Sequence, residues 1–202
     1  MERREIQAVT EAVIRSLFVE LEASGRHVHV NKEQAMALFG HPLTEKRPLS
    51  QPGQYLANER VTVVGPKGKF ENVAVLGPER SAAQVEISLT DGRTLGIQPP
   101  VRLSGDIAGS PGGKLIGPRG TVELTQGVIA AKRHIHMTPE DALCMGVSDK
   151  QQVRLQVYTT RPVIFEDVTV RVNGDFQTYA HLDYDEANAC GFQAGDLGRI
   201  LT

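Results

Sequence analysis

The N-terminal segment carries its apolar residues at the spacing of an amphipathic helix. Within residues 2–22 they recur at steps of three and four and therefore share one face: Ile6, Val9, Val13, Leu17 and Leu21. Ser24 and Gly25 follow and favour a stop. The pattern predicts a helix over residues 2–22 with an apolar face.

The chain changes character after residue 25. Short β-branched runs alternate apolar and polar positions, as in "RVTVVG", "QVEISL" and "DVTVRV", and Gly and Pro separate them closely. Two short helices are predicted at 31–39 and 138–145, where Asn31 and Thr138 suit N-caps and Pro139 suits the first turn. Many short strands with frequent turns favour barrels or sandwiches over a doubly wound sheet.

Part of the sequence occurs twice. "RHVHVNKEQAMALFG" (26–40) matches "RHIHMTPEDALCMGV" (133–147), 107 residues further on, and "ERVTVVGPKGKF" (59–70) matches "EDVTVRVNGDF" (166–176) at nearly the same offset. Two copies are too few for a solenoid. We expect a mainly β fold of two β-barrel domains with a pseudo-twofold relation. The Gly/Pro-rich stretch 109–120 is either a connector or a surface loop.

Four of the six histidines lie in two His-x-His pairs, His27 with His29 and His134 with His136. Residues i and i+2 of a strand point to the same face, so each pair can bind one metal ion. The alternative is a pair of half-buried histidines that are hydrogen-bonded to the backbone. Equivalent positions in a repeated unit favour the metal.

Two histidines need a third ligand. His181 lies at a predicted strand end and is the candidate third ligand of one pair. His41 follows a glycine in a turn and is expected on the surface. Glu86, between Val85 and Ile87, is either an outward-facing carboxylate or the third ligand of the other pair. Three protein ligands with one open position are typical of catalytic zinc.

Basic residues near glycine-bearing turns suggest anion binding. Lys67 and Lys69 lie in "VVGPKGKF", which lacks the spacing of a P-loop, and Arg80 follows a Gly-Pro turn six residues before Glu86. The guanidinium fork of arginine suits phosphate. Each of these residues could also be an ordinary solvated surface charge.

Composition and charge exclude some classes of function. The 202 residues are 40% hydrophobic and 23% charged, the net charge is −2, and aromatic residues make up 5% with no Trp, which argues against nucleic-acid binding. No apolar run reaches the length of a membrane span and no signal peptide is evident. Cys144 and Cys190 have no metal or redox spacing and are expected to be reduced thiols that fill small buried spaces, in a cytoplasmic protein.

Several longer motifs resemble one known family. "RHVHV", the stretch from "QPGQYLANER" to "SAAQVEIS", "GRTLGI", "GVIAAKRHIHMTPEDAL" and "HLDYDEANACGF" are similar to the phosphate propanoyltransferases, the zinc-dependent phosphotransacylases of bacterial microcompartments. The resemblance runs from about residue 24 to the C-terminus. It implies two β-barrels capped by short helices, with a first strand that pairs with the C-terminal barrel, and two zinc ions per chain.

The resemblance also implies roles for single residues. His27, His29 and Glu86 would hold one zinc ion, His134, His136 and His181 the other, and Arg80 would bind phosphate. Coenzyme A would contact Ala23, Ser24, Gly25, Lys67 and Asn188. The chain departs from the family at Gly25, where asparagine is common, and at Ala74, where an arginine contacts coenzyme A.

The implied reaction exchanges acyl-CoA and phosphate for acyl phosphate and coenzyme A. The zinc ion on Glu86 would take the coenzyme A sulfur, and the second zinc ion would offset the charge of phosphate. Two alternatives are a binuclear zinc hydrolase of thioesters or phosphoesters and a non-catalytic binding module with structural zinc.

The expected organisation is an N-terminal helix (1–22), a first barrel unit (23–128) and a second barrel unit (129–202). Short amphipathic helices such as the first resemble peptides that carry enzymes into bacterial microcompartments. We therefore expect a homo-oligomer whose helix docks on shell or lumen proteins, or else packs on the barrel or a second copy.

Overall fold

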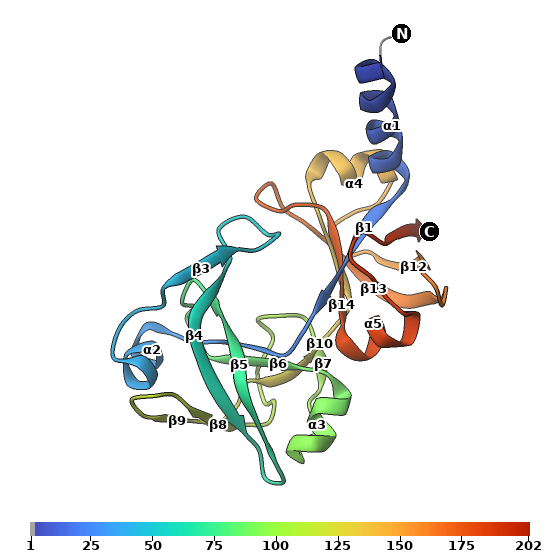
Figure 1. Ribbon diagram of the computed structural model, residues 1–202. Coiled ribbons are helices and arrows are strands. Elements are labelled where there is room, and N and C mark those ends of the chain that lie inside the picture. Colours follow the sequence, from blue (N-terminus) through green and yellow to red (C-terminus); the bar gives the residue numbers. More distant parts are fainter. Residues whose placement is uncertain (1–2) are drawn as a thin grey trace. The chain divides into compact units, whose positions relative to one another are not determined.

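The computed structural model describes residues 3–202, and the chain forms two compact units (Figure 1). Unit 1 combines the N-terminal segment up to Ser24 with Arg133–Leu182 and Glu186–Thr202. Unit 2 consists of Gly25–Lys132 and Asp183–Asp185. The expectation of a mainly β fold is confirmed.

Unit 1 is a closed six-stranded barrel in the order β1-β14-β11-β13-β12-β15. The ring closes where Val19 and Glu20 of β1 pair antiparallel with Gly198 and Leu197 of β15. Alternate residues of the strands fill its interior, including Leu21, Ile135 and Leu155. The elements are α1 (Arg3–Leu17), β1 (Val19–Ser24), β11 (His134–Met137), α4 (Pro139–Met145), β12 (Gln152–Tyr158), β13 (Ile164–Val172), β14 (Tyr179–Asp183), α5 (Tyr184–Cys190) and β15 (Leu197–Leu201).

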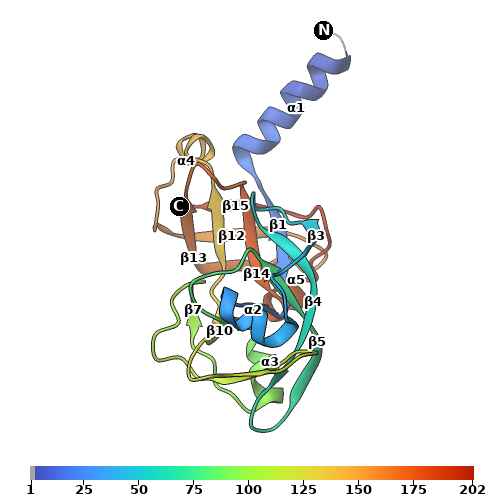
Figure 2. The same cartoon turned by 90° about the vertical axis from the view of Figure 1, so that its left-hand side faces the viewer.

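Unit 2 contains a curled sheet in the order β7-β10-β6-β2-β5-β4-β8-β9, with β3 paired to β4. Its core includes Val28, Val75, Val85 and Leu115. The long β4–β5 hairpin and the helix α2 are prominent in Figure 2. The elements are β2 (His27–His29), α2 (Lys32–Phe39), β3 (Glu45–Pro48), β4 (Tyr55–Val64), β5 (Lys69–Gly77), β6 (Gln84–Ile87), α3 (Leu89–Leu95), β7 (Val101–Arg102), β8 (Gly113–Ile116), β9 (Thr121–Leu124) and β10 (Val128–Ala131).

The two short helices predicted after the His-x-His strands are confirmed, including their caps. The Asn31 side chain accepts a hydrogen bond from the Gln34 backbone N–H, and the Gln34 side chain accepts one from the Asn31 N–H, which completes a capping box. Thr138 caps α4 through the Asp141 N–H, with Pro139 in the first turn. Gly40 and Gly146 end the helices in the left-handed conformation. Local sequence therefore fixes where each His-x-His strand stops.

The N-terminal helix is shorter than its apolar spacing predicts. It ends at Leu17, and Leu21 lies on β1, where it is 2% exposed in the barrel core, whereas Leu17 is 47% exposed. Residues 19–22 also alternate apolar and polar side chains, so the segment fits a strand as well as a helix. Residues 19–22 form a strand because β1 pairs with β15 and β14 in the barrel. Residue 2, the first of the predicted helix, lies outside the described part of the chain.

The internal repeat continues in a different register from the one predicted. His27 pairs with Ala74 of the parallel strand β5, and His134 pairs with Thr169 of the parallel strand β13. Residue 74 therefore corresponds to residue 169, an offset of 95 and not 107. The likeness of "VTVVGPKGKF" to "VTVRVNGDF" therefore does not mark equivalent positions in the two units. The segment between α4 and the β12–β13 hairpin of unit 1 is shorter than the one between α2 and the β4–β5 hairpin of unit 2, because it contains no strand that corresponds to β3.

Two smaller expectations need correction. The stretch 109–120 is neither a connector nor merely a surface loop, because it lies within unit 2 and contains β8, which pairs with β4. Cys190 is buried as predicted, but Cys144 is exposed on α4; both are free thiols. Within residues 3–202, no helix has both the length and the apolar character that crossing a membrane requires.

The different environments of two leucines on the same apolar stripe give a direct test. Leu21→Ala should lower the free energy of unfolding of the barrel unit by about 2–5 kcal/mol, because it leaves a cavity in the core. Leu17→Ala should change it by no more than about 0.5 kcal/mol. Chemical denaturation followed by circular dichroism measures both. Equal effects of the two variants would contradict the assignment of Leu21 to β1.

Candidate metal centres and anion site

In unit 2, two neighbouring strands bring together three of the predicted site residues. Strand β2 pairs antiparallel with β6 so that His27 lies opposite Glu86 and His29 opposite Gln84. Directly paired residues share a face of the sheet, and so do residues i and i+2. All four side chains therefore gather on one face. We name His27, His29 and Glu86 the Glu86 centre.

The distances within the Glu86 centre suit a metal ion better than direct hydrogen bonds. Glu86 Oε1 lies 3.5 Å from His27 Nε2 and 3.6 Å from His29 Nε2, longer than an ordinary hydrogen bond. Ligands bound tetrahedrally to zinc at about 2.0–2.1 Å lie roughly 3.3 Å from one another. The side chains therefore surround a space of the right size.

The backbone orients the two imidazoles of the Glu86 centre. His27 Nδ1 lies 2.8 Å from the carbonyl oxygen of Gly25, and His29 Nδ1 lies 3.3 Å from that of Leu76. Because a carbonyl only accepts, each Nδ1 carries a proton, which leaves Nε2 as the possible ligand atom on the side of Glu86. Such a hydrogen bond from the second nitrogen is typical of metal-binding histidines.

Burial and neighbouring charges set the protonation states of the Glu86 centre. Burial lowers the pKa of His29 to about 4. For Glu86, burial opposes ionisation, but His27 and His29 outweigh it and hold the pKa well below the usual range. Burial also opposes the charged form of His27, but Glu86 raises its pKa. Near neutral pH His29 is neutral and Glu86 ionised, as metal binding requires, whereas a metal ion would have to displace the proton that Glu86 favours on His27.

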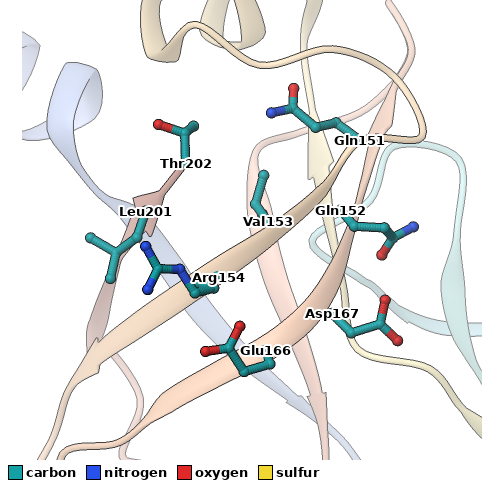
Figure 3. Close-up of a pocket in the computed structure, with 8 residues that line it drawn as sticks. All are labelled: Gln151, Gln152, Val153, Arg154, Glu166, Asp167, Leu201 and Thr202. Carbon is teal, nitrogen blue, oxygen red and sulfur yellow. The ribbon is translucent and has the colours of Figure 1, made fainter.

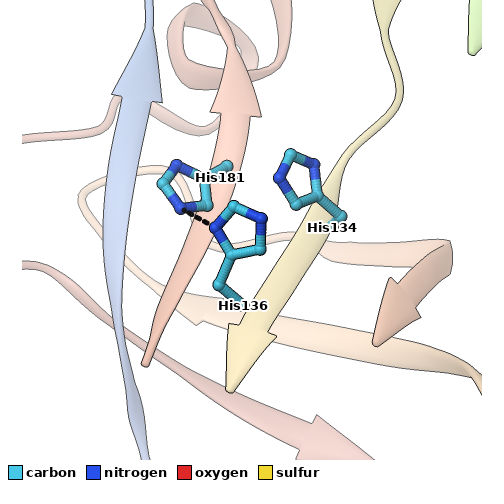
Figure 4. A group of neighbouring side chains, drawn as sticks. All are labelled: His134, His136 and His181. Carbon is cyan, nitrogen blue, oxygen red and sulfur yellow. Dashed lines mark hydrogen bonds between the residues drawn. The ribbon is translucent and has the colours of Figure 1, made fainter. Parts of the chain in front are cut away.

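Unit 1 contains a second group, His134, His136 and His181, which we name the His181 centre. The pairing of β11 with β14 places His134 opposite His181 and His136 opposite Tyr179. The three rings turn toward one another (Figure 4), and a ligand atom from each lies within 4.8 Å of the others. His136 Nδ1 lies 3.1 Å from His181 Nε2.

A carboxylate behind the His181 centre orients one of its rings. Glu22 on β1 places Oε2 3.2 Å from His181 Nδ1, so that nitrogen carries the proton and Nε2 faces His136. A histidine held by a carboxylate is a frequent arrangement behind bound zinc. The donor set of each centre therefore fits a zinc ion.

An arginine anchors each His-x-His strand in the same way. Arg26 donates to both carboxylate oxygens of Asp91 at 2.6 and 3.0 Å and stacks on Phe70 at 4.1 Å. Arg133 donates to Glu186 at 2.7 Å and lies 5.7 Å from the centre of the Phe165 ring. We call each such set of arginine, phenylalanine and acidic residue an arginine clamp. It ties the strand of the first two ligands to the helix that follows the third.

Arg80 lies near the Glu86 centre and contacts it through Ser104. Arg80 Nη1 donates to Ser104 Oγ at 3.0 Å, and Ser104 Oγ donates to Glu86 Oε1 at 2.8 Å. The guanidinium also acts electrostatically on both histidines: it adds to the lowering of the His29 pKa, which burial dominates, and partly opposes the raising of the His27 pKa. The predicted phosphate ligand therefore belongs to the surroundings of the predicted metal ligands.

The predicted coenzyme A residues are divided between the units. Ala23 and Ser24 end β1 in unit 1, and Gly25 begins unit 2. Lys67 is exposed in the β4–β5 turn of unit 2, and Asn188 is exposed on α5 of unit 1. Neither unit by itself contains the whole set. His41 is exposed as predicted, 3.8 Å from Glu59.

A separate pocket of about 410 Å³ lies on unit 1 (Figure 3) and includes none of the predicted site residues. Strands β12, β13 and β15 and the turn before β12 provide its lining: Gln151, Gln152, Val153, Arg154, Glu166, Asp167, Leu201 and Thr202.

Sequence reasoning missed Glu22, Gln84, Ser104 and the arginine clamps. The arginines were visible, because each directly precedes a His-x-His pair. Their partners follow the structural offset of 95, from Phe70 to Phe165 and from Asp91 to Glu186, as do the third ligands Glu86 and His181. A repeat search that allows a 12-residue deletion after the first helix would have found them. Nothing local marks Ser104 or Glu22.

Fold and site together define a mainly β protein with two candidate metal centres built on a repeated strand pair. Residues 20–193 match the model of the phosphate propanoyltransferase family, so the chain belongs to that family, and it is an acyltransferase.

Curated relatives of that name match nearly the whole chain. One from Listeria monocytogenes is 54% identical over 198 residues, which cover 97% of this chain and 93% of the relative. One from Enterococcus faecalis is 57% identical over 184 residues, with 90% and 87% covered. One from Salmonella typhimurium is 46% identical over 196 residues, with 95% and 93% covered.

The two centres predict the metal content of single variants. The purified protein should hold two zinc ions per chain, and so should His41→Ala, because His41 lies in neither centre. His29→Ala and His136→Ala should each retain about one ion, since two remaining ligands bind zinc far more weakly than three. Elemental analysis of dialysed protein measures this. Two full equivalents in either ligand variant would contradict the assignment.

Proposed function

We propose that this enzyme transfers a short acyl group, such as propanoyl, between coenzyme A and phosphate, with one zinc ion in each centre. The observation that carries the proposal is the Glu86 centre, where one carboxylate oxygen lies 3.5 and 3.6 Å from two Nε2 atoms, near an arginine. The choice of propanoyl as the acyl group rests on the names of the relatives.

Each residue has a role that follows from its chemistry. His27, His29 and Glu86 would hold one ion, and His134, His136 and His181 the other. Zinc, when bound, stabilises a thiolate and polarises a carbonyl group. Arg80 would bind two phosphate oxygens with its planar fork and so present a third to the thioester.

We favour direct transfer over an acyl-enzyme intermediate. A phosphate oxygen attacks the carbonyl carbon of the thioester, the carbon–sulfur bond breaks, and coenzyme A leaves as the thiolate. Neither thiol of the chain suits an acyl-enzyme, because Cys190 is buried in the barrel core and Cys144 is exposed on α4. The coenzyme A contacts proposed for Ala23, Ser24, Gly25, Lys67 and Asn188 rest on the family alone.

Release of free thiol from propanoyl-CoA tests the function. We expect release only when phosphate is present, with acyl phosphate formed in equal amount. His29→Ala and His136→Ala should abolish release, whereas His41→Ala should retain it. Release without phosphate would indicate a thioesterase, and no release under either condition would indicate a binding protein.

We further propose that α1 directs the enzyme into a microcompartment, as part of a homo-oligomer. Its apolar residues remain exposed although the helix contacts α4: Ile6, Val9, Val13, Ile14 and Leu17. Figure 1 shows the helix projecting from the barrel. Such a face can dock on a shell or lumen protein.

Deletion of residues 1–17 tests this role, because it removes α1 and leaves β1 intact. The shortened enzyme should keep its specific activity and zinc content but no longer co-purify with shells when expressed beside them. Unchanged co-purification would contradict the targeting role.

A further inference from the structure

The loop after β7 contributes a hydroxyl group that contacts both the metal centre and the arginine of unit 2. Ser104 Oγ lies 2.8 Å from Glu86 Oε1, 3.0 Å from Arg80 Nη1 and 2.8 Å from Gln84 Nε2. We call these four residues the Ser104 junction. The same Glu86 oxygen, Oε1, faces the two histidines of the Glu86 centre.

The chemistry of the four side chains determines the direction of each hydrogen bond in the Ser104 junction. Guanidinium and amide nitrogens only donate, so the hydroxyl oxygen accepts from Arg80 and from Gln84. Its single hydrogen is then left for Glu86, which as a carboxylate only accepts. One donated and two accepted hydrogen bonds fill the capacity of the hydroxyl. Its orientation is therefore determined by its neighbours.

The backbone determines the orientation of Gln84 in turn. The Gly105 N–H donates to Gln84 Oε1 at 2.7 Å, which leaves Nε2 to donate to Glu86 Oε1 at 2.5 Å and to Ser104. Gln84 is 3% exposed. Glu86 Oε1 thus receives two hydrogen bonds from groups that cannot turn away, which holds that oxygen toward the histidines.

We propose that Ser104 is a positioning residue that fixes the Glu86 carboxylate and the Arg80 guanidinium relative to each other. The inference rests on the proposed roles of Glu86 as metal ligand and Arg80 as phosphate ligand. Loss of the hydroxyl loosens both partners at once, because each loses one hydrogen bond to the same atom. Ser104 should therefore affect both zinc affinity and phosphate binding, and each effect can be measured separately. It would act through Glu86 and Arg80, without contact to the zinc ion or the phosphate.

Three variants test the proposal. Ser104→Ala removes the hydroxyl, and Ser104→Thr retains it. Ser110→Ala is the matched control in the same loop, because the Ser110 hydroxyl donates to the Ile107 carbonyl and accepts from the Gly127 N–H, neither of which is one of the four junction residues. Thermal unfolding of each variant separates a general loss of stability from a local effect.

Zinc affinity of the Glu86 centre is measured by chelator competition in a His136→Ala background, where the other centre is disabled. Ser104→Ala should weaken zinc binding about 10- to 100-fold, as is typical when a group that orients a ligand is lost. Ser104→Thr and Ser110→Ala should stay within about threefold of the parent. Unchanged affinity in Ser104→Ala would overturn the link to Glu86.

Phosphate binding is measured with both native centres and saturating zinc, so that occupancy is equal. Ser104→Ala should raise KM for phosphate about tenfold, the order expected for one hydrogen bond to a charged group. Arg80→Lys should raise it by at least as much, because lysine loses the bidentate fork. In the Arg80→Lys background, Ser104→Ala should add less than about twofold, because the shared contact is already gone. Additive effects would overturn the link to Arg80.

The outcomes also separate this inference from the proposed function. If Arg80→Lys and zinc removal leave phosphate-dependent thiol release unchanged, the proposed function itself is wrong. If both impair it while Ser104→Ala behaves like Ser110→Ala, the function stands and the positioning role of Ser104 is wrong.

Discussion

The antiparallel pairing of each His-x-His strand with the strand of its third ligand is the constraint on which both centres depend. It places Glu86 opposite His27 in unit 2 and His181 opposite His134 in unit 1. A shift of one residue would turn the third ligand to the other face of the sheet, where apolar side chains pack. The arginine clamps oppose such a shift, since Asp91 and Glu186 lie five residues beyond the third ligands and bind the arginines that precede the first.

The shared frame holds two centres of different charge. With Glu86 as third ligand, a divalent ion would keep one net positive charge, whereas three neutral histidines would leave two. The position beside the third ligand differs as well, because Gln84 of unit 2 corresponds to Tyr179 of unit 1. The two copies of the repeat thus share the backbone register and the arginine clamps, but two side-chain differences give each centre its own electrostatics. This difference suits a reaction whose partners are a thiolate and a phosphate.

Burial of so many polar groups in a β frame is tolerable only because they are paired. Every buried side-chain nitrogen or oxygen in the described part of the chain has a hydrogen-bonding partner. Backbone carbonyls hold the Glu86-centre histidines, Glu22 holds His181, and the Ser104 junction holds Glu86. The side chains of both candidate centres are therefore oriented by the protein itself, which would leave little ordering to oppose binding of a metal ion.

Local pattern alone determined much of this protein. The His-x-His pairs, the capped helices that follow them and the mainly β character come from spacing and residue type over a few positions, whereas the assignment of Glu86 and His181 to the two groups also needed the resemblance to a known family. Tertiary structure decided the features for which the local pattern allowed more than one conformation or partner. Residues 19–22 fit both a helix and a strand, and pairing with β15 selects the strand. The true repeat offset, the partners of Arg26 and Arg133, and the contacts of Ser104 and Glu22 join residues 18 to 159 positions apart. Strand pairing and loop geometry bring such residues together, and neither leaves a periodic signal in the sequence.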